Sequence, residues 1–236
     1  MSNAPCFEAV THRVNVSNAE SVAEVARAAD ALGRVKSVVH TAGLSLAQAS
    51  ADAILHVDLL GVAHTLDEFG KVIAKGGAGI VIASMAGTFM AGKLPPEVEL
   101  ALERTPTEEL LDLPILKAPQ FQDPGAAYSL AKRANQLRVQ AASLAWGHRG
   151  ARLNSISPGI ISTAMGREEL EGESGGAMRA MVAASSIGRT GTSSEITAAA
   201  AFLLGAESSF VTGTDLLVDG GVVAAVRSGV LKAGRE

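Results

Sequence analysis

The chain has 236 residues, of which 47% are hydrophobic and 19% are charged, and 20 Lys and Arg against 24 Asp and Glu give a formal net charge of −4. This length and apolar fraction suit one folded α/β domain and exclude an intrinsically disordered chain. The cationic residues form no basic block, which argues against a protein that holds nucleic acid through phosphate contacts.

The sequence shows no sign of export or of a membrane anchor. Its single cysteine, Cys6, rules out an internal disulfide bond and a cysteine-built zinc site, and it suits a reducing compartment. Residues 1–13 contain no apolar stretch typical of a signal peptide, and no run approaches the ~18 apolar residues of a membrane span. We therefore expect a cytoplasmic protein without membrane contact.

The first part of the chain alternates apolar segments with amphipathic ones. Residues 10–16 (VTHRVNV) predict a short strand, and Ser17 with Glu20 has the form of a helix capping box. Further strands are expected over 35–40 and 79–83, with a long helix over 51–75 between them. Short unbroken apolar strands that alternate with helices predict a parallel sheet covered on both faces.

Residues 88–125 do not follow this alternation. They contain six prolines together with several acidic and apolar residues. One interpretation is a surface excursion with a short helix or two, and the other is a lid over a functional site. The position after the carboxyl end of a strand favours the lid. Beyond it, helices are predicted over 128–146 and 193–204, and strands over 151–157 and 216–219.

Tyr128 and Lys132 are four residues apart at the start of a predicted helix, so both project from one face. An ammonium group beside a phenol stabilises the phenolate, which makes the phenol a general acid or base for an alcohol or carbonyl oxygen. The pair alone is weak evidence, because Tyr-x-x-x-Lys arises often by chance and a surface tyrosine is the ordinary explanation.

Three predicted strands end in small or hydroxyl-bearing residues. These ends are residues 41–43 (TAG), Ser84, and residues 157–163 (SPGIIST). The carboxyl ends of parallel strands share one edge, where open α/β sheets bind their ligands. Each motif by itself fits a structural loop, but together with Tyr128 and Lys132 they predict a single crevice.

These motifs, taken together, resemble those of the short-chain dehydrogenase/reductase family, from about residue 10 to residue 221. The segment His40-Thr41-Ala42-Gly43 stands where that family has Asn-Asn-Ala-Gly. The other matching segments are 82–87 (IASMAG), 128–132 (YSLAK), 154–159 (NSISPG), 187–191 (IGRTG), 195–196 (EI), 210–213 (FVTG) and 218–221 (VDGG).

The resemblance implies an oxidoreductase that moves a hydride between NAD or NADP and a secondary alcohol or its ketone. Tyr128 would exchange the proton of the substrate oxygen, Ser84 would orient that oxygen, and Lys132 would hold the nicotinamide ribose. The residues that it places against the cofactor are Thr41, Ala42, Gly43, Ile82, Ala83, Tyr128, Lys132, Pro158, Gly159, Ile160, Ile161 and Thr163. The implied fold is a Rossmann-like, doubly wound parallel sheet with a lid-like insertion at about 88–125.

Two features depart from the family pattern. The helix-borne asparagine that joins a water relay to the lysine is replaced by Asp58, which could relay protons or form a buried ion pair. Ser84 and Tyr128 lie 44 positions apart (128 − 84), against about a dozen in most relatives, so the insertion is long.

A third departure lies at the front of the sequence. The family opens with a strand, a Gly-x-x-x-Gly-x-Gly turn and a helix, then a second strand and helix, whereas this sequence begins at the equivalent of the third strand. Two βα units, about 50–60 residues, are therefore expected to be missing from a single domain that spans residues 1–236. The missing turn binds the pyrophosphate, and the residue that selects NAD or NADP follows the second strand. Three explanations stay open: the given sequence starts late within a longer protein, residues 10–16 pair directly with 35–40, or a partner subunit covers the exposed edge.

Two functional hypotheses follow. The first is an NAD(P)-dependent dehydrogenase, favoured by the retention of Ser84, Tyr128 and Lys132, and the second is a non-catalytic binding or assembly subunit, favoured by the missing turn. The partner in the first is a small alcohol or carbonyl compound, and no nucleic acid, membrane or metal is expected. Family relatives form tetramers or dimers, so a homotetramer or homodimer is expected here.

Overall fold

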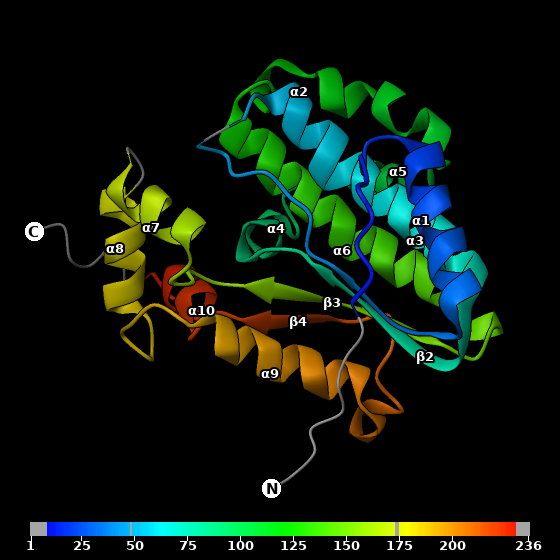
Figure 1. Ribbon diagram of the computed structural model, residues 1–236. Helices are drawn as coiled ribbons and strands as arrows, with labels where there is room; N and C mark the ends of the chain where they lie inside the picture. The colour runs from blue at the N-terminus through cyan, green and yellow to red at the C-terminus, as the bar shows by residue number, and fades with distance from the viewer. Residues whose placement is uncertain (1–8, 48, 173–174, 230–236) are drawn as a thin grey trace, which may run out of the picture.

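Four parallel strands form the sheet of the computed structural model, which describes residues 9–47, 49–172 and 175–229 (Figure 1). In spatial order they are β1 (Val35–His40), β2 (Ile73–Ile82), β3 (Arg152–Pro158) and β4 (Asp215–Val218). Every neighbouring pair is parallel, so each connection crosses over one face of the sheet. The predicted Rossmann-like α/β architecture is confirmed.

Helices cover the two faces of this sheet unequally. On one face α3 and α6 contact the strands and α1 packs on α3, whereas α9 lies on the other face against β2 and β3 (Figure 1). These helices are α1 (Ala19–Leu32), α3 (Gly61–Val72), α6 (Pro124–His148) and α9 (Ser193–Leu204). The short helix α2 (Ala51–Ile54) and the π-helix η1 (Leu55–Leu60) precede α3 directly.

Strand alternation decides which side chains meet which helices. In β2, Val81 packs in the core beneath α3 and α6, and its neighbour Ile80 packs in the core beneath α9. In β1, Val38 is buried, whereas Val39 on the opposite face is 48% exposed because α9 lies over β2 and β3. This part of the sheet therefore presents an apolar side chain to solvent.

Trp146 sets the close packing of α6 on the sheet. The ring is 1% exposed, and its Nε1 donates a hydrogen bond to the Leu66 carbonyl oxygen at 3.1 Å. A Cβ atom added at Gly79 would lie 2.5 Å from this ring, and one at Gly70 would lie 2.9 Å from Nε1. The two glycines thus make room for the largest buried side chain of the core.

The strand and the capping box predicted for the amino-terminal region are wrong. Residues 9–15 form no strand, and Val10 and Val14 are 53% and 42% exposed, so the predicted strand over 10–16 does not pair with β1. The apolar residues of this segment alternate, but Val10 and Val14 meet no buried face, and Val16 is half-buried beside Gly61. The capping box is wrong as well, because Asn18 rather than Ser17 caps α1, accepting a hydrogen bond from the Ser21 N–H at 2.9 Å.

The helix predicted over 51–75 is interrupted and shorter. It divides into α2, η1 and α3, and it ends at Val72 because β2 begins at Ile73 rather than at residue 79. The register of β1 on β2 shifts between Val35 and Ser37, opposite Gly76, whose φ of +76° lies in the left-handed region. Gly76 thus lies at an irregularity within strand β2, where the sequence predicted a break between helix and strand.

The segment 88–125 folds as a series of short helices, namely α4 (Met85–Met90), α5 (Pro96–Arg104), η2 (Thr107–Asp112), η3 (Pro114–Lys117) and η4 (Pro119–Phe121). Of these, α4 contacts β3 and α6, α5 and η4 contact α6, and η2 contacts η1. Leu102 and Leu110 are fully buried in the core that they share with η1 and α6. Arg138 of α6 donates hydrogen bonds to the carbonyl oxygens of Leu102 and Thr105 at 3.2 and 2.9 Å. That this insertion acts as a lid stays a prediction.

The remaining helices lie near the carboxyl edge of the sheet. Figure 1 shows α7, α8 and α10 beyond the tips of β3 and β4. Their bounds, with the short η5 that follows α9, are α7 (Ala164–Glu171), α8 (Gly175–Ala184), η5 (Ala206–Ser208) and α10 (Val222–Arg227). None of the helices within the described ranges has the length and apolarity needed to cross a bilayer.

Candidate active site

The carboxyl ends of β1, β2 and β3 and the first turns of α6 meet at one edge of the sheet. Helix α6 starts there because Asp123 caps it, accepting hydrogen bonds from the N–H groups of Gly125 and Ala126 at 2.9 and 3.0 Å. Since α6 precedes the parallel strand β3, it runs back along the sheet from this edge. Tyr128 and Lys132 therefore lie near the strand ends.

Lys132 lies beside the ring of Tyr128. Its Nζ is 5.2 Å from the ring centroid, and its residue is 5% exposed, whereas Tyr128 is half-buried. A buried ammonium group at this distance interacts with the face of the ring. The spacing of four residues therefore does bring the two side chains together, as the sequence predicted.

Asp58 is the charge partner of Lys132. Its Oδ2 lies 3.0 Å from Lys132 Nζ, and Lys132 also donates to the Ile82 carbonyl oxygen at 3.4 Å. The other oxygen, Oδ1, accepts a hydrogen bond from the Leu44 N–H at 2.7 Å. Asp58 lies in the π-helix η1, and its carbonyl oxygen accepts a hydrogen bond from Asn135 Nδ2 at 2.8 Å. Of the two roles that the sequence left open, the structure shows the buried ion pair.

Gly43 fits against this ion pair. A Cβ atom there would lie 3.2 Å from Asp58 Oδ2 and 3.5 Å from Lys132 Nζ. The preceding residues, Thr41 and Ala42, are exposed. The segment after β1 thus combines an accessible backbone with a direct contact to the charged pair, which suits a ligand that approaches the chain closely.

Ser84 follows β2 and caps α4, where its side chain accepts a hydrogen bond from the Ala86 N–H at 3.1 Å. Helix α4 packs closely on α6. A Cβ atom added at Gly87 would lie only 2.7 Å from the Lys132 carbonyl and 2.8 Å from the Arg133 nitrogen. The helix that carries Ser84 is therefore seated directly on the backbone of Lys132.

The segment after β3 is held by different contacts. Gly159 N–H donates to the Val218 carbonyl oxygen at 2.9 Å, and Ser162 N–H donates to that of Gly191 at 2.8 Å. Thr163 caps α7 by accepting from the Gly166 N–H at 3.0 Å. These bonds place the predicted cofactor residues Pro158, Gly159, Ile160, Ile161 and Thr163 between β4 and α7.

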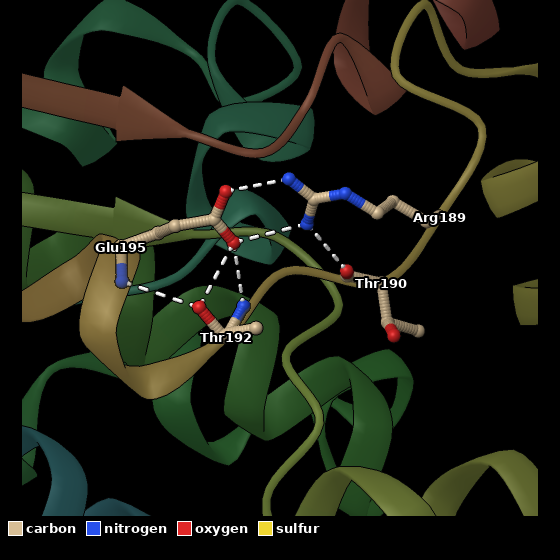
Figure 2. Close-up of polar contacts among 4 residues, drawn as sticks. All are labelled: Arg189, Thr190, Thr192 and Glu195. Carbon is tan, nitrogen blue, oxygen red and sulfur yellow. Dashed lines mark hydrogen bonds and ion pairs between the residues drawn. The ribbon is translucent and has the colours of Figure 1, made fainter.

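The turn that supports this segment is held by Arg189 and Glu195. Figure 2 shows the guanidinium forming two bonds to the carboxylate, at 3.0 and 2.7 Å, while Thr192 completes a capping box with Glu195 at the start of α9. Arg189, with the hydrogen bonds from Thr192, holds the pKa of Glu195 at about 2. Gly191 in this turn donates to the Ile160 carbonyl oxygen at 2.9 Å.

His40 stands at the end of β1 and is 6% exposed. Its Nδ1 lies 3.0 Å from Thr65 Oγ1, and the Thr65 hydroxyl also lies 2.9 Å from the Gly61 carbonyl oxygen. Nε2 is buried and has no hydrogen-bond partner among the described residues. Burial, reinforced by the positive charge of Lys132, lowers the pKa of His40 to about 4, so the imidazole is neutral near pH 7.

Contacts within the site join Tyr128, Lys132, Asp58, Gly43 and Ile82, and α4 brings Ser84 to the same edge. Sequence reasoning missed the packing role of Gly87 and the support that Asn135 gives to Asp58. Asn135 follows Lys132 by three positions, and this helical spacing was the available signal.

Comparison with known sequences gives a match to a family profile and matches to individual proteins. The profile of the enoyl-(acyl carrier protein) reductase family matches residues 109–223. The short-chain dehydrogenase/reductase bsc3 of Alternaria brassicicola is 44% identical over 218 residues, which cover 92% of this chain and 79% of that protein. The 3-alpha-hydroxysteroid dehydrogenase/carbonyl reductase of Comamonas testosteroni is 29% identical, over 94% of this chain and 91% of that protein.

Among solved structures, the 3-alpha-hydroxysteroid dehydrogenase of Pseudomonas sp. B-0831, crystallised with NADH, aligns with a TM-score of 0.76 and 25% identity. The alignment covers 91% of this chain and 84% of that one. The chain thus shares both sequence and fold with proteins of this type along most of its length.

Proposed function

Because the chain belongs to the short-chain dehydrogenase/reductase family, we propose that it is an NAD- or NADP-dependent oxidoreductase for a secondary alcohol or the corresponding ketone. The observation that carries the proposal is the buried ammonium group of Lys132, 5.2 Å from the ring of Tyr128. The same reaction class is supported by the relative whose name is 3-alpha-hydroxysteroid dehydrogenase/carbonyl reductase and by the similar structure that was crystallised with NADH.

The residues around Lys132 fit a nicotinamide cofactor. An ammonium group has three N–H donors, and Lys132 gives one to the Ile82 carbonyl oxygen while its charge is paired with Asp58, so it can still donate to a ribose hydroxyl. The bound cofactor would supply or accept the hydride. The residues that would hold it are Thr41, Ala42, Gly43, Ile82, Ala83, Tyr128, Lys132, Pro158, Gly159, Ile160, Ile161 and Thr163. The 236 residues contain no Gly-x-x-x-Gly-x-Gly sequence, so these residues account for the nicotinamide half of the site.

The protein's own groups move the proton. In the reducing direction the Tyr128 hydroxyl donates its proton to the carbonyl oxygen of the substrate, and the Ser84 hydroxyl donates a hydrogen bond to the same oxygen. The ammonium group of Lys132 stabilises the phenolate that is left, and Asp58 fixes the position of Lys132. In the oxidising direction the same groups act in reverse.

The experiment is turnover with a panel of secondary alcohols and ketones, with both cofactors, followed through the absorbance of the reduced nicotinamide. Tyr128→Phe keeps the ring beside Lys132 but removes the acidic hydroxyl, so we expect kcat to fall about a thousandfold while cofactor affinity is kept. The control is Ser129→Ala, next in the chain, whose hydroxyl donates to the Gly125 carbonyl oxygen. Unchanged turnover in Tyr128→Phe would overturn the assignment.

The proposal extends to the assembly of the protein. We propose that the whole chain forms one domain and that it assembles into a homodimer or homotetramer, as the family resemblance of its motifs implies. Light scattering of the purified protein measures the assembly directly, and a monomeric mass would contradict this part of the proposal without bearing on the chemistry.

A further inference from the structure

A single side-chain contact joins the two loops that flank the candidate site. Ser45 Oγ donates a hydrogen bond to Glu169 Oε1 at 2.8 Å, across 124 positions of sequence. Ser45 follows residues 41–43 after β1, and Glu169 lies in α7, which follows the segment after β3. Both segments proposed to line the cofactor therefore lead directly into this contact.

The Ser45 side of the contact is fixed to the reacting groups. Ser45 is 1% exposed, and its Oγ also accepts a hydrogen bond from the Ala47 N–H at 3.2 Å. The preceding residue, Leu44, donates its N–H to Asp58, which pairs with Lys132. A displacement of Ser45 is thus opposed by the same carboxylate that positions Lys132.

The Glu169 side of the contact lies on a helix anchored at its first turn. A Cβ atom at Gly166 would lie 2.0 Å from the Ile161 carbonyl oxygen, so the start of α7 sits directly on the segment after β3. Glu169 lies one turn further along and reaches back to Ser45. Figure 1 shows α7 and α8 beyond the tips of β3 and β4, at the edge of the sheet where the site lies.

We propose that the Ser45–Glu169 hydrogen bond is a latch that holds α7 over the opening of the site, so that ligand entry and release require this bond to break. A hydroxyl bound to a carboxylate makes a stronger bond than two neutral groups do, and loss of Glu169 leaves the buried Ser45 hydroxyl without this acceptor. Ser45 and Glu169 are therefore positioning residues. The identity of the ligand, a nicotinamide cofactor, rests on the proposed function.

Limited digestion with trypsin tests the latch without any ligand. Arg167 is exposed on α7, and cleavage after it requires the helix to open. We expect Ser45→Ala, Glu169→Ala and the double variant each to raise the cleavage rate at Arg167 about tenfold, with the double variant no faster than either single variant. Glu171→Ala, which removes an exposed carboxylate from the same helix, serves as the control and should cleave at the wild-type rate.

The latch is overturned if the single variants are cleaved at the wild-type rate. It is also overturned if the cleavage rate of the double variant rises by the product of the two single-variant accelerations. Global unfolding, followed through the fluorescence of Trp146, separates local opening from loss of the fold. The latch requires faster cleavage without an equal fall in global stability.

A second measurement links the latch to the ligand. Rapid mixing should show NADH or NADPH leaving Ser45→Ala and Glu169→Ala about tenfold faster than wild type, with Glu171→Ala unchanged. If the wild type binds neither cofactor, the proposed function fails, and the digestion still decides whether the latch exists. If the wild type binds and the variants release at its rate, the latch is wrong as a gate and the proposed function stands.

Discussion

Lys132 Nζ lies 3.0 Å from Asp58 Oδ2, and the two side chains are only 6% and 0% exposed. A carboxylate occupies the position at which the family carries a neutral asparagine, so the ammonium group has a full counter-charge within contact distance. Burial of two charges costs much solvation energy, and the pair is maintained only because each partner compensates the other. This relationship couples the stability of the fold to the chemistry of the site.

Asp58→Asn should therefore destabilise the protein. The amide can still accept the Leu44 hydrogen bond, but it leaves the Lys132 ammonium group buried without a counter-charge. We expect the free energy of unfolding to fall by about 3 kcal/mol, measured by urea titration with Trp146 fluorescence as the signal. Asp52→Asn is the control, because that side chain is 86% exposed. A stability equal to wild type would show that the buried charge pair is not formed in solution.

The lowered pKa of the buried His40 predicts that the stability of the fold depends on pH. Its pKa is about 4 in the folded protein and about 6.5 in an unfolded chain, so the unfolded state binds more protons between these values. The stability contributed by the neutral imidazole is complete above pH 6.5 and is lost as the pH falls toward 4, by about 3 kcal/mol at most.

Urea titrations at several pH values, with wild type and His40→Asn, measure this effect. Asparagine does not titrate, so the variant should lose less stability than wild type between pH 6.5 and 4. Equal losses in the two proteins would assign the pH dependence to other groups. The control is His56→Asn, because the His56 side chain is 43% exposed.

The close packing of Gly87 predicts that a substitution at this position reduces activity, although Gly87 does not contact the reacting groups. A Cβ atom at this position would overlap the backbone of Lys132 and Arg133, so Gly87→Ala should push α4, and Ser84 with it, away from α6. Small misplacements of a reacting group reduce rates steeply, and we expect kcat to fall about a hundredfold. Gly147→Ala is the matched control, because a Cβ atom there meets nothing within 4 Å. Wild-type kcat in Gly87→Ala would mean that the packing of α4 does not set the position of Ser84.

Ser84→Ala should reduce kcat by about a hundredfold, because the substrate oxygen loses a hydrogen-bond donor as its charge develops. The side chain also caps α4, so Ser84→Thr, which keeps the hydroxyl and the cap, should restore most of the rate. Steady-state kinetics with both variants separates the two roles, since similar losses in alanine and threonine would point to the cap or to crowding rather than to the hydroxyl.

Much of the fold could be predicted from local patterns. Strand β1 (Val35–His40) and helix α9 (Ser193–Leu204) begin and end where the apolar pattern and the capping residues placed them. The strand predicted over 10–16 failed because alternation records only which residues are apolar. Whether a buried face receives them depends on neighbours distant in sequence, and Val10 and Val14 have none to cover them.

In the candidate site, too, contacts within one helix could be predicted from the sequence, whereas contacts between separate elements could not. The spacing of Tyr128 and Lys132 predicted their contact because four residues make one turn of a helix. The ion pair of Asp58 with Lys132 and the bond of Ser45 with Glu169 join separate elements, and no sequence period links their positions. They become visible only when the strand ends are brought to one edge of the sheet.

The measurement that tests the central claim most directly is a titration of the folded wild-type chain with NADH and with NADPH, followed through nicotinamide fluorescence. The proposal predicts saturable binding of at least one of them, with loss of affinity in Lys132→Met, which removes the donor to the ribose. A chain that is folded by the Trp146 signal but binds neither cofactor would contradict the assignment of this site to a nicotinamide-dependent oxidoreductase.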